Sequence, residues 1–184
     1  YTGSVETITY MASEPASLKY EGPKDDEQYI VGSYLTFTFR ALSADNDKYD
    51  EIFDGDLKQW KINYYKDASL YWSGFVQSDK LSRLYLKDSY FITLKASDWL
   101  GELKAVEFRS GNSAYQGLSS YLQVLKTALA FTGLELDFLV QLNSYETNYM
   151  TSTTDVVKNL YLNRSRFTST QNGKTRYSKV YDVI

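Results

Sequence analysis

The stretch from Leu57 to Val76, LKQWKINYYKDASLYWSGFV, constrains the fold most strongly because it predicts a β-hairpin. Trp60, Ile62 and Tyr64 alternate with polar residues, the period-2 pattern of a strand with one buried face. A short polar break at 66–68 separates this run from a second one, in which we expect Leu70, Trp72 and Val76 to share a face. Gly74 lies inside that second run, as glycines do at bulges and close backbone approaches.

Further strands are predicted on both sides of this hairpin. Tyr34 to Ala41 alternates cleanly, and two more runs cover residues 81–86 and 90–96. We therefore expect a run of antiparallel strands over residues 34–97, joined by short connections. A run of this kind closes into a barrel or folds over as a sandwich. The predicted fold class is mainly β with minor α: an antiparallel β-barrel or sandwich with one packed helix.

One long helix is predicted over about residues 119–132. Ser119 or Ser120 is placed to cap its start, and Gly133 lies where a C-terminal glycine ends a helix. Leu118, Leu122, Leu125 and Leu129 recur at helical spacing, so we expect this stripe to pack on the sheet. The predicted domains are accordingly residues 1–133, a β-barrel domain containing the helix, and residues 134–184, a smaller α+β extension.

The rest of the chain gives four further expectations. Residues 134–140 alternate like a strand, and residues 155–161 favour a short helix. Residues 164–176 hold four basic side chains among Ser, Thr, Asn and Gln, which predicts a solvated loop. The chain starts at Tyr1 without Met and ends in what looks like the first turn of a helix, so we expect it to be part of a longer protein.

Composition excludes several kinds of chemistry. The chain has 184 residues with neither Cys nor His, so disulfides, thiolate metal sites, His-based zinc sites and a Ser-His-Asp triad are impossible. The net charge of −3 argues against non-specific nucleic-acid binding, and no apolar run approaches the length of a membrane span. Asp45-x-Asp47 begins like a calcium loop but lacks the later Gly and Glu of that motif. We expect no catalytic residues, no metal and no cofactor.

The order of motifs resembles tail proteins of bacteriophages and prophages, particularly those of Bacteroides-type hosts, and the wider baseplate-hub family. Residues 62–67 lead into Trp72-x-Gly74, the "W-x-G" element of that family. The strand that follows ends in Ala96-x-Asp98-x-Leu100-x-x-Leu103, similar to "A-x-D-x-L-x-x-L", and a helix comes next. The likeness covers roughly residues 34–136.

The resemblance implies a structural component of a phage tail, located in the virion after assembly in the bacterial cytoplasm. It implies small β-barrel domains like those of tail-tube and hub subunits, and as partners other tail or baseplate proteins and further copies of the chain in a ring. It brings no catalytic residues. The residues expected to form the structural framework are Trp60, Tyr64, Trp72, Gly74, Phe75, Asp98 and Trp99.

The competing hypothesis is a non-catalytic carbohydrate-binding β-domain. The chain has 18 Tyr, 9 Phe and 3 Trp, and exposed aromatic rings stack on sugars. This hypothesis requires Trp72 or Trp99 to be exposed, whereas the tail hypothesis places both in the framework.

Overall fold

The computed structural model describes residues 8, 11–21, 30–42, 49–53, 55–77, 82–83, 89–137 and 156–184. The chain separates into two compact units, Tyr1–Trp99 and Leu100–Ile184. The compact units therefore divide near residue 100, whereas the sequence placed a domain boundary between residues 133 and 134. Each unit has its own hydrophobic core.

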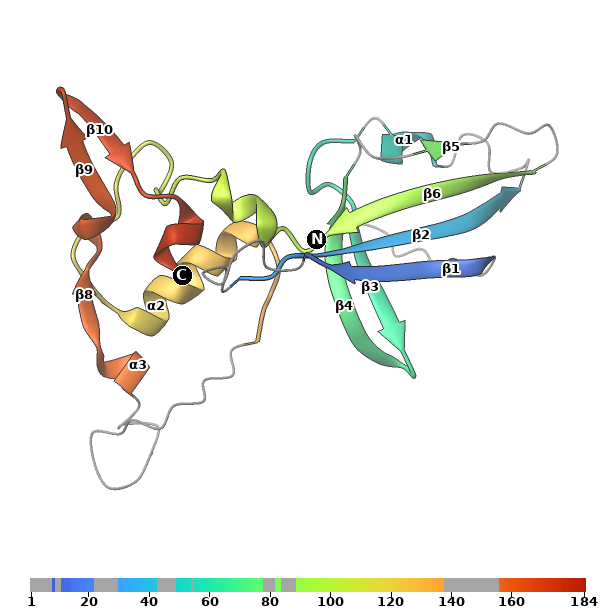
Figure 1. The fold of residues 1–184 in the computed structure, drawn as a ribbon, viewed down its shortest axis with the longest axis horizontal. Helices are drawn as coiled ribbons and strands as arrows, with labels where there is room; N and C mark the ends of the chain where they lie inside the picture. Colours follow the sequence, from blue (N-terminus) through green and yellow to red (C-terminus); the bar gives the residue numbers. More distant parts are fainter. Residues whose placement is uncertain are drawn as a thin grey trace, which may run out of the picture. The chain divides into compact units, whose positions relative to one another are not determined.

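The first unit is an antiparallel sheet of six strands (Figure 1). Its elements are β1 (Met11–Tyr20), β2 (Ser33–Leu42), α1 (Asp50–Phe53), β3 (Lys61–Lys66), β4 (Ser69–Val76), β5 (Ser82–Arg83) and β6 (Ser89–Ser97). The strand order is β1-β2-β6-β4-β3, and β5 also pairs with β6. The predicted mainly β class with minor α is confirmed.

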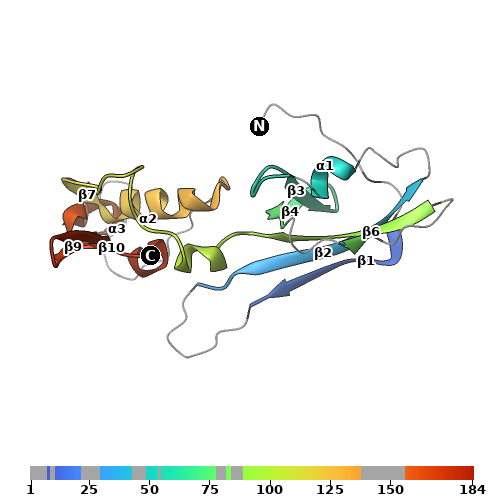
Figure 2. The ribbon, with the colours of Figure 1, turned by 90° about the horizontal axis from the view of Figure 1, so that it is seen from above.

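The order of the strands differs from a simple meander. β2 pairs with β6 from Tyr34↔Ser97 to Leu42↔Ser89, so the strand that is later in the chain lies between β2 and β4. Figure 2 shows the β3–β4 hairpin and α1 on one side of the layer formed by β1, β2 and β6. The path of described strands runs from β1 to β3 without closing, so the expected barrel is not formed by them.

The core of the first unit is built by alternation along β2 and β6. The inward residues of β2 are Leu35, Phe37, Phe39 and Ala41, as the sequence predicted, and those of β6 are Tyr90, Ile92, Leu94 and Ala96. Cross-strand neighbours such as Phe37 and Leu94 are paired in register, which stacks their side chains on one face. Ile52 and Phe53 of α1 pack against this core.

The β3–β4 hairpin turns at Asp67 and Ala68, which both have positive φ, 51° and 61°. This is the conformation of two-residue turns that match the twist of their strands. The register shifts after Tyr64, so that Tyr65 faces Leu70 while Tyr64 faces Trp72. The bulge corrects one prediction: Leu70 is 56% exposed and does not share the buried face of Trp72.

The second unit combines the α-helices α2 and α3 with short strands and 3-10 turns (Figure 1). Its elements are η3 (Gly101–Lys104), β7 (Leu118–Ser120), α2 (Tyr121–Leu129), η4 (Ala130–Thr132), α3 (Val156–Asn159), β8 (Tyr161–Asn163), η5 (Arg164–Phe167), β9 (Thr168–Gln171), β10 (Lys174–Tyr177) and η6 (Val180–Val183). β7 pairs with β8, and β9 with β10, in two antiparallel ribbons. The predicted solvated loop at 164–176 is thus an ordered turn and hairpin.

Helix α2 has the predicted ends but a different buried face. The Ser120 hydroxyl accepts a hydrogen bond from the Gln123 N–H at 3.3 Å, and Gly133 ends the following turn with φ 80°. The fully buried residues are Val124 and Ala128, whereas Leu118 of the predicted leucine stripe is 73% exposed. The stripe prediction was wrong because the buried face is centred on Val124 and Ala128, one residue and therefore about 100° around the helix from Leu125 and Leu129.

The core of the second unit explains this choice of face. Val124 and Ala128 pack with Leu103, Phe108, Val180 and Val183, which come from elements at both ends of the unit. The helix therefore packs on 3-10 turns and loops of its own unit, whereas the sequence predicted packing on a sheet. The expected helical residues 180–184 form η6, and the expected helix at 155–161 appears as α3. Residues 134–137 are not a strand; the rest of that prediction lies outside the described residues.

Candidate functional site

A buried hydrogen-bond network joins two of the motifs that the sequence singled out. The Trp72 indole N–H donates to the Ser33 hydroxyl oxygen at 2.8 Å. The Ser33 hydroxyl donates to the Asp98 carboxylate at 2.6 Å, and the Ser33 backbone N–H donates to the same oxygen at 2.7 Å. All three side chains are buried. The network connects the start of β2, the middle of β4 and the end of β6.

Gly74 is required by the position of the Trp72 ring. A Cβ at residue 74 would overlap the far edge of the Trp72 indole and would lie 2.5 Å from the Ser97 carbonyl oxygen. The "W-x-G" spacing therefore has a physical cause, since the ring folds back over the strand two residues later. Phe75, the next residue, is fully buried on the other face.

The other framework residues lie around the edge of this network. Trp60 is half-buried and its indole N–H donates to the Glu51 carbonyl at 3.3 Å. Tyr64 is half-buried and packs on the core. Trp99 has a positive φ of 64°, and its backbone N–H donates to the Ser97 hydroxyl at 3.1 Å.

Lys58 lies over the face of Trp99, with its ammonium 4.3 Å from the ring centroid. Burial lowers the pKa of Lys58 from its ordinary value of 10.5. The contact with the Trp99 ring is one that a charged ammonium makes.

The structure thus brings Trp72, Gly74 and Asp98 together through Ser33, a residue that sequence reasoning missed. Ser33 begins β2, and nothing in its neighbours marks it as different from an ordinary strand-end serine. These residues form a structural network. Because the Trp72 side chain is 8% exposed and hydrogen-bonded, it does not offer its face to a sugar ring in this fold.

The second unit contains a hollow of about 500 Å³ beside a short backbone ladder. Phe108 N–H donates to the Ser178 carbonyl at 2.9 Å and Val180 N–H to the Val106 carbonyl at 2.8 Å, which sets Glu107 opposite Lys179. Ala105, Glu107, Arg109, Phe131 and Lys179 are among the residues that line the hollow.

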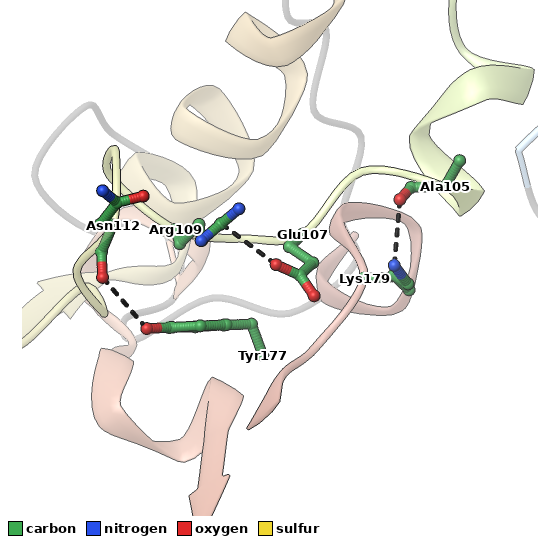
Figure 3. Close-up of polar contacts among 6 residues, drawn as sticks. All are labelled: Ala105, Glu107, Arg109, Asn112, Tyr177 and Lys179. Carbon is green, nitrogen blue, oxygen red and sulfur yellow. Dashed lines mark hydrogen bonds and ion pairs between the residues drawn. The ribbon is translucent and has the colours of Figure 1, made fainter. Parts of the chain in front are cut away.

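The charged groups of this hollow have partners within the second unit (Figure 3). Arg109 forms an ion pair with Glu107 at 3.1 Å, and Lys179 donates to the Ala105 carbonyl at 3.0 Å. The Tyr177 hydroxyl donates to the Asn112 carbonyl at 3.2 Å, with Arg109 above its ring. These contacts hold residues 105–112 against residues 177–179, so the arrangement serves the fold of the second unit.

The exposed large apolar side chains include two groups of neighbours. At the end of the β3–β4 hairpin, Tyr65, Leu70 and Tyr71 are each more than half exposed, and we call them the hairpin tip. Tyr65 and Leu70 face each other across the strands, and Tyr71 is the neighbouring bulged residue. The second place is the β7–β8 ribbon, where Leu118 and Tyr161 lie on one face.

Comparison with protein-family models, curated proteins and solved structures finds no match to this chain. Within the described residues, no helix is both long and apolar enough to cross a membrane. The same part of the chain contains no cluster of three acidic side chains placed to hold a metal ion.

Proposed function

We propose that this chain is a non-catalytic structural component of a phage or prophage tail, acting at the tail tip through protein–protein contacts. The proposal is supported by the resemblance of residues 34–136 to hub proteins. The Trp72–Ser33–Asp98 network gives a physical reason for two of the motifs that carry this resemblance. Through Ser33, it links Trp72 of the "W-x-G" element to Asp98, the residue that follows β6.

The exposure of the hairpin tip is the observation that supports the proposed mode of action. Exposed tyrosines beside an exposed leucine are typical of the centre of protein interfaces, where aromatic residues are enriched. Fully burying one such side chain contributes about 1.5–3 kcal/mol. β3 also forms an end of the described sheet, so its outer backbone groups can pair with a strand of a partner.

The experiment that tests the assignment is antibody labelling of particles released from an induced culture of the source organism, followed by electron microscopy. We expect label at the end of the tails, because the resemblance places the chain at the tail tip. Intact tails that carry no label would contradict the proposal.

The mode of action is tested by the double variant Tyr65→Ser/Tyr71→Ser. We expect the variant to fold and to be absent from assembled tails, because both rings are exposed and are assigned to partner contacts. Tyr20→Ser, at an exposed tyrosine on β1, is the matched control and should enter tails normally. Incorporation of the double variant at the wild-type level would show that the hairpin tip makes no essential contact.

Carbohydrate binding is the second candidate function, and the same exposed rings favour it. Tyr65 and Tyr71 are exposed and available for stacking, whereas Trp72 is buried. A glycan array probed with the wild type and with Tyr65→Ser/Tyr71→Ser separates the two functions. Glycan binding that the wild type shows and the double variant loses would support a function in binding host-surface glycans.

A further inference from the structure

The hollow of the second unit gathers three charged side chains on one face of its short backbone ladder (Figure 3). Glu107 and Lys179 lie opposite each other, and the backbone hydrogen bonds are made by the residues on either side of them. In an antiparallel pair of this kind the two side chains lie close together on the same face. Arg109 follows two residues after Glu107, and its guanidinium reaches the Glu107 carboxylate at 3.1 Å. All three side chains therefore line the hollow from the same side.

The fold uses only part of the hydrogen-bonding capacity of these groups. An ammonium has three N–H donors and a guanidinium has five. Among the described residues, Lys179 binds the Ala105 carbonyl, and Arg109 pairs with Glu107 through Nε and lies over the Tyr177 ring. In the same part of the chain, the second carboxylate oxygen of Glu107 has no hydrogen bond. Arg109 and Glu107 are each 39% exposed, so a ligand that enters the hollow can reach both.

The hollow also has the size and the apolar lining of a binding site. Its volume of about 500 Å³ lies within the range of about 300–1,000 Å³ that small-molecule sites occupy. A Cβ added at Gly111 would meet no atom within 4 Å, so open space lies beside the backbone there. Val106 and Phe131 are half-buried and contribute apolar surface to the lining.

The charges select the class of ligand. Two cations and one carboxylate give these three side chains a net charge of +1, which suits a monocarboxylate better than a phosphate of nearly two negative charges. The described residues of the second unit, 100–137 and 156–184, hold nine basic and five acidic side chains. The field of this unit, with a net charge of +4, therefore attracts an anion.

We propose that this hollow binds a sugar acid, a sugar ring that carries one carboxylate. The spare donors of Arg109 and Lys179 bind the sugar carboxylate through charge-assisted hydrogen bonds. The second oxygen of Glu107 accepts from a sugar hydroxyl, and the Phe131 ring packs against the apolar face of the sugar. The inference goes beyond the proposed function, because it involves neither the hairpin tip nor a contact between subunits.

A titration of the isotope-labelled chain, followed by backbone amide NMR signals, tests the ligand class. We expect methyl β-D-glucuronide to bind with a Kd of about 1 mM, as suits a ligand of its size, and to shift the signals of residues 105–111 and 177–179. Methyl β-D-glucoside has a neutral CH2OH in place of the carboxylate, and acetate has the carboxylate without the ring. Each should bind at least about tenfold more weakly, because each lacks one set of the proposed contacts.

Two pairs of variants test the assigned residues. Lys179→Gln should weaken glucuronide binding about tenfold, because it removes a charged donor. Lys174→Gln makes the same chemical change at an exposed lysine of β10 outside the hollow and should bind normally. Arg109→Gln should weaken binding by a similar factor, and its matched control is Arg176→Gln on β10. The unbound spectrum of each variant must keep the dispersion of the wild type, which separates lost binding from lost folding.

Three results would overturn the inference. One is an absence of shifts at about 10 mM glucuronide, tenfold above the expected Kd. Another is binding of the glucoside or of acetate as tight as that of the glucuronide. The third is a folded Lys179→Gln variant with unchanged affinity. The comparison of ligands needs no variant, so it decides the question even if Arg109→Gln fails to fold.

Discussion

At the scale of single residues, Ser33 connects the parts of the first unit that the motifs mark. Its hydroxyl accepts from Trp72 and donates to Asp98, while its backbone N–H binds the same carboxylate. A buried carboxylate is unfavourable unless hydrogen bonds replace its hydration. Ser33 supplies two of the hydrogen bonds to the Asp98 carboxylate, and the two residues are expected to contribute as a unit.

The first prediction concerns this network. Asp98→Ala leaves the Ser33 N–H and hydroxyl without their buried acceptor, so we expect the free energy of unfolding to fall by about 3 kcal/mol. All three tryptophans lie in the first unit, so tryptophan fluorescence during urea unfolding reports on that unit alone. Glu51→Ala, at an exposed acid, is the control and should change stability by less than about 0.5 kcal/mol. Equal effects of the two substitutions would contradict the assigned role of Asp98.

The second prediction concerns pH and Lys58. Because burial lowers the pKa of Lys58 in the folded chain below 10.5, the unfolded chain binds more protons between the two pKa values. The stability of the first unit should therefore rise with pH as it approaches 10.5 from below. The measurement is the difference in unfolding free energy between the wild type and Lys58→Met, starting from about pH 8. The advantage of the methionine variant should shrink with rising pH, and a pH-independent difference would refute the shifted pKa.

At the scale of elements, the β3–β4 hairpin combines a tight turn with a bulge. Asp67 and Ala68 both adopt left-handed backbone angles, which ordinary side chains disfavour. The bulge after Tyr64 then turns Leu70 outward while Trp72 stays in the core. The hairpin tip is exposed because of these two local features, and its proposed contacts depend on them.

The third prediction uses the strain in this turn. Ala68→Gly should stabilise the first unit by about 1 kcal/mol, because glycine adopts positive φ without steric cost. Ser69→Gly, at the adjacent exposed position with ordinary angles, should lower stability by about 0.5–1 kcal/mol. The urea midpoint by tryptophan fluorescence measures both. A loss of stability in Ala68→Gly would show that the turn differs from the one described.

At the scale of the whole molecule, the chain has two cores that share no residue. One is formed by β2, β6 and the β3–β4 hairpin, and the other surrounds α2. The two units also differ in charge, the first acidic and the second basic. Separate cores with opposite charge suit a subunit that contacts different neighbours through different units.

The fourth prediction tests whether the cores are independent. Val124→Ala removes two methyl groups from a fully buried site, so we expect the second unit to lose about 2 kcal/mol. Amide hydrogen exchange should accelerate in α2, while the tryptophan transition of the first unit stays unchanged. Leu118→Ala, at an exposed leucine of the predicted stripe, should have little effect. A shift of the tryptophan transition would show that the units unfold together.

Local patterns in the sequence determined the strands, the turns and the ends of α2. Alternation along 34–41 and 90–96 fixes which side chains of β2 and β6 face inward, because a strand has only two faces. Ser120 and Gly133 mark the helix ends because their chemistry acts over one turn. The leucine stripe prediction failed because helical spacing does not determine which face of the helix meets the core, and the face buried in α2 carries Val124 and Ala128.

Only the tertiary structure decided how these elements combine. The insertion of β6 between β2 and β4 depends on pairing between segments about 50 residues apart, and local spacing carries no information about such pairs. The same holds for Ser33, whose role comes from Trp72 and Asp98, 39 and 65 residues away. The core around α2 likewise joins Leu103 to Val180. The sequence of each segment determines the secondary structure that it favours. Long-range packing determines how those segments pair and combine into cores.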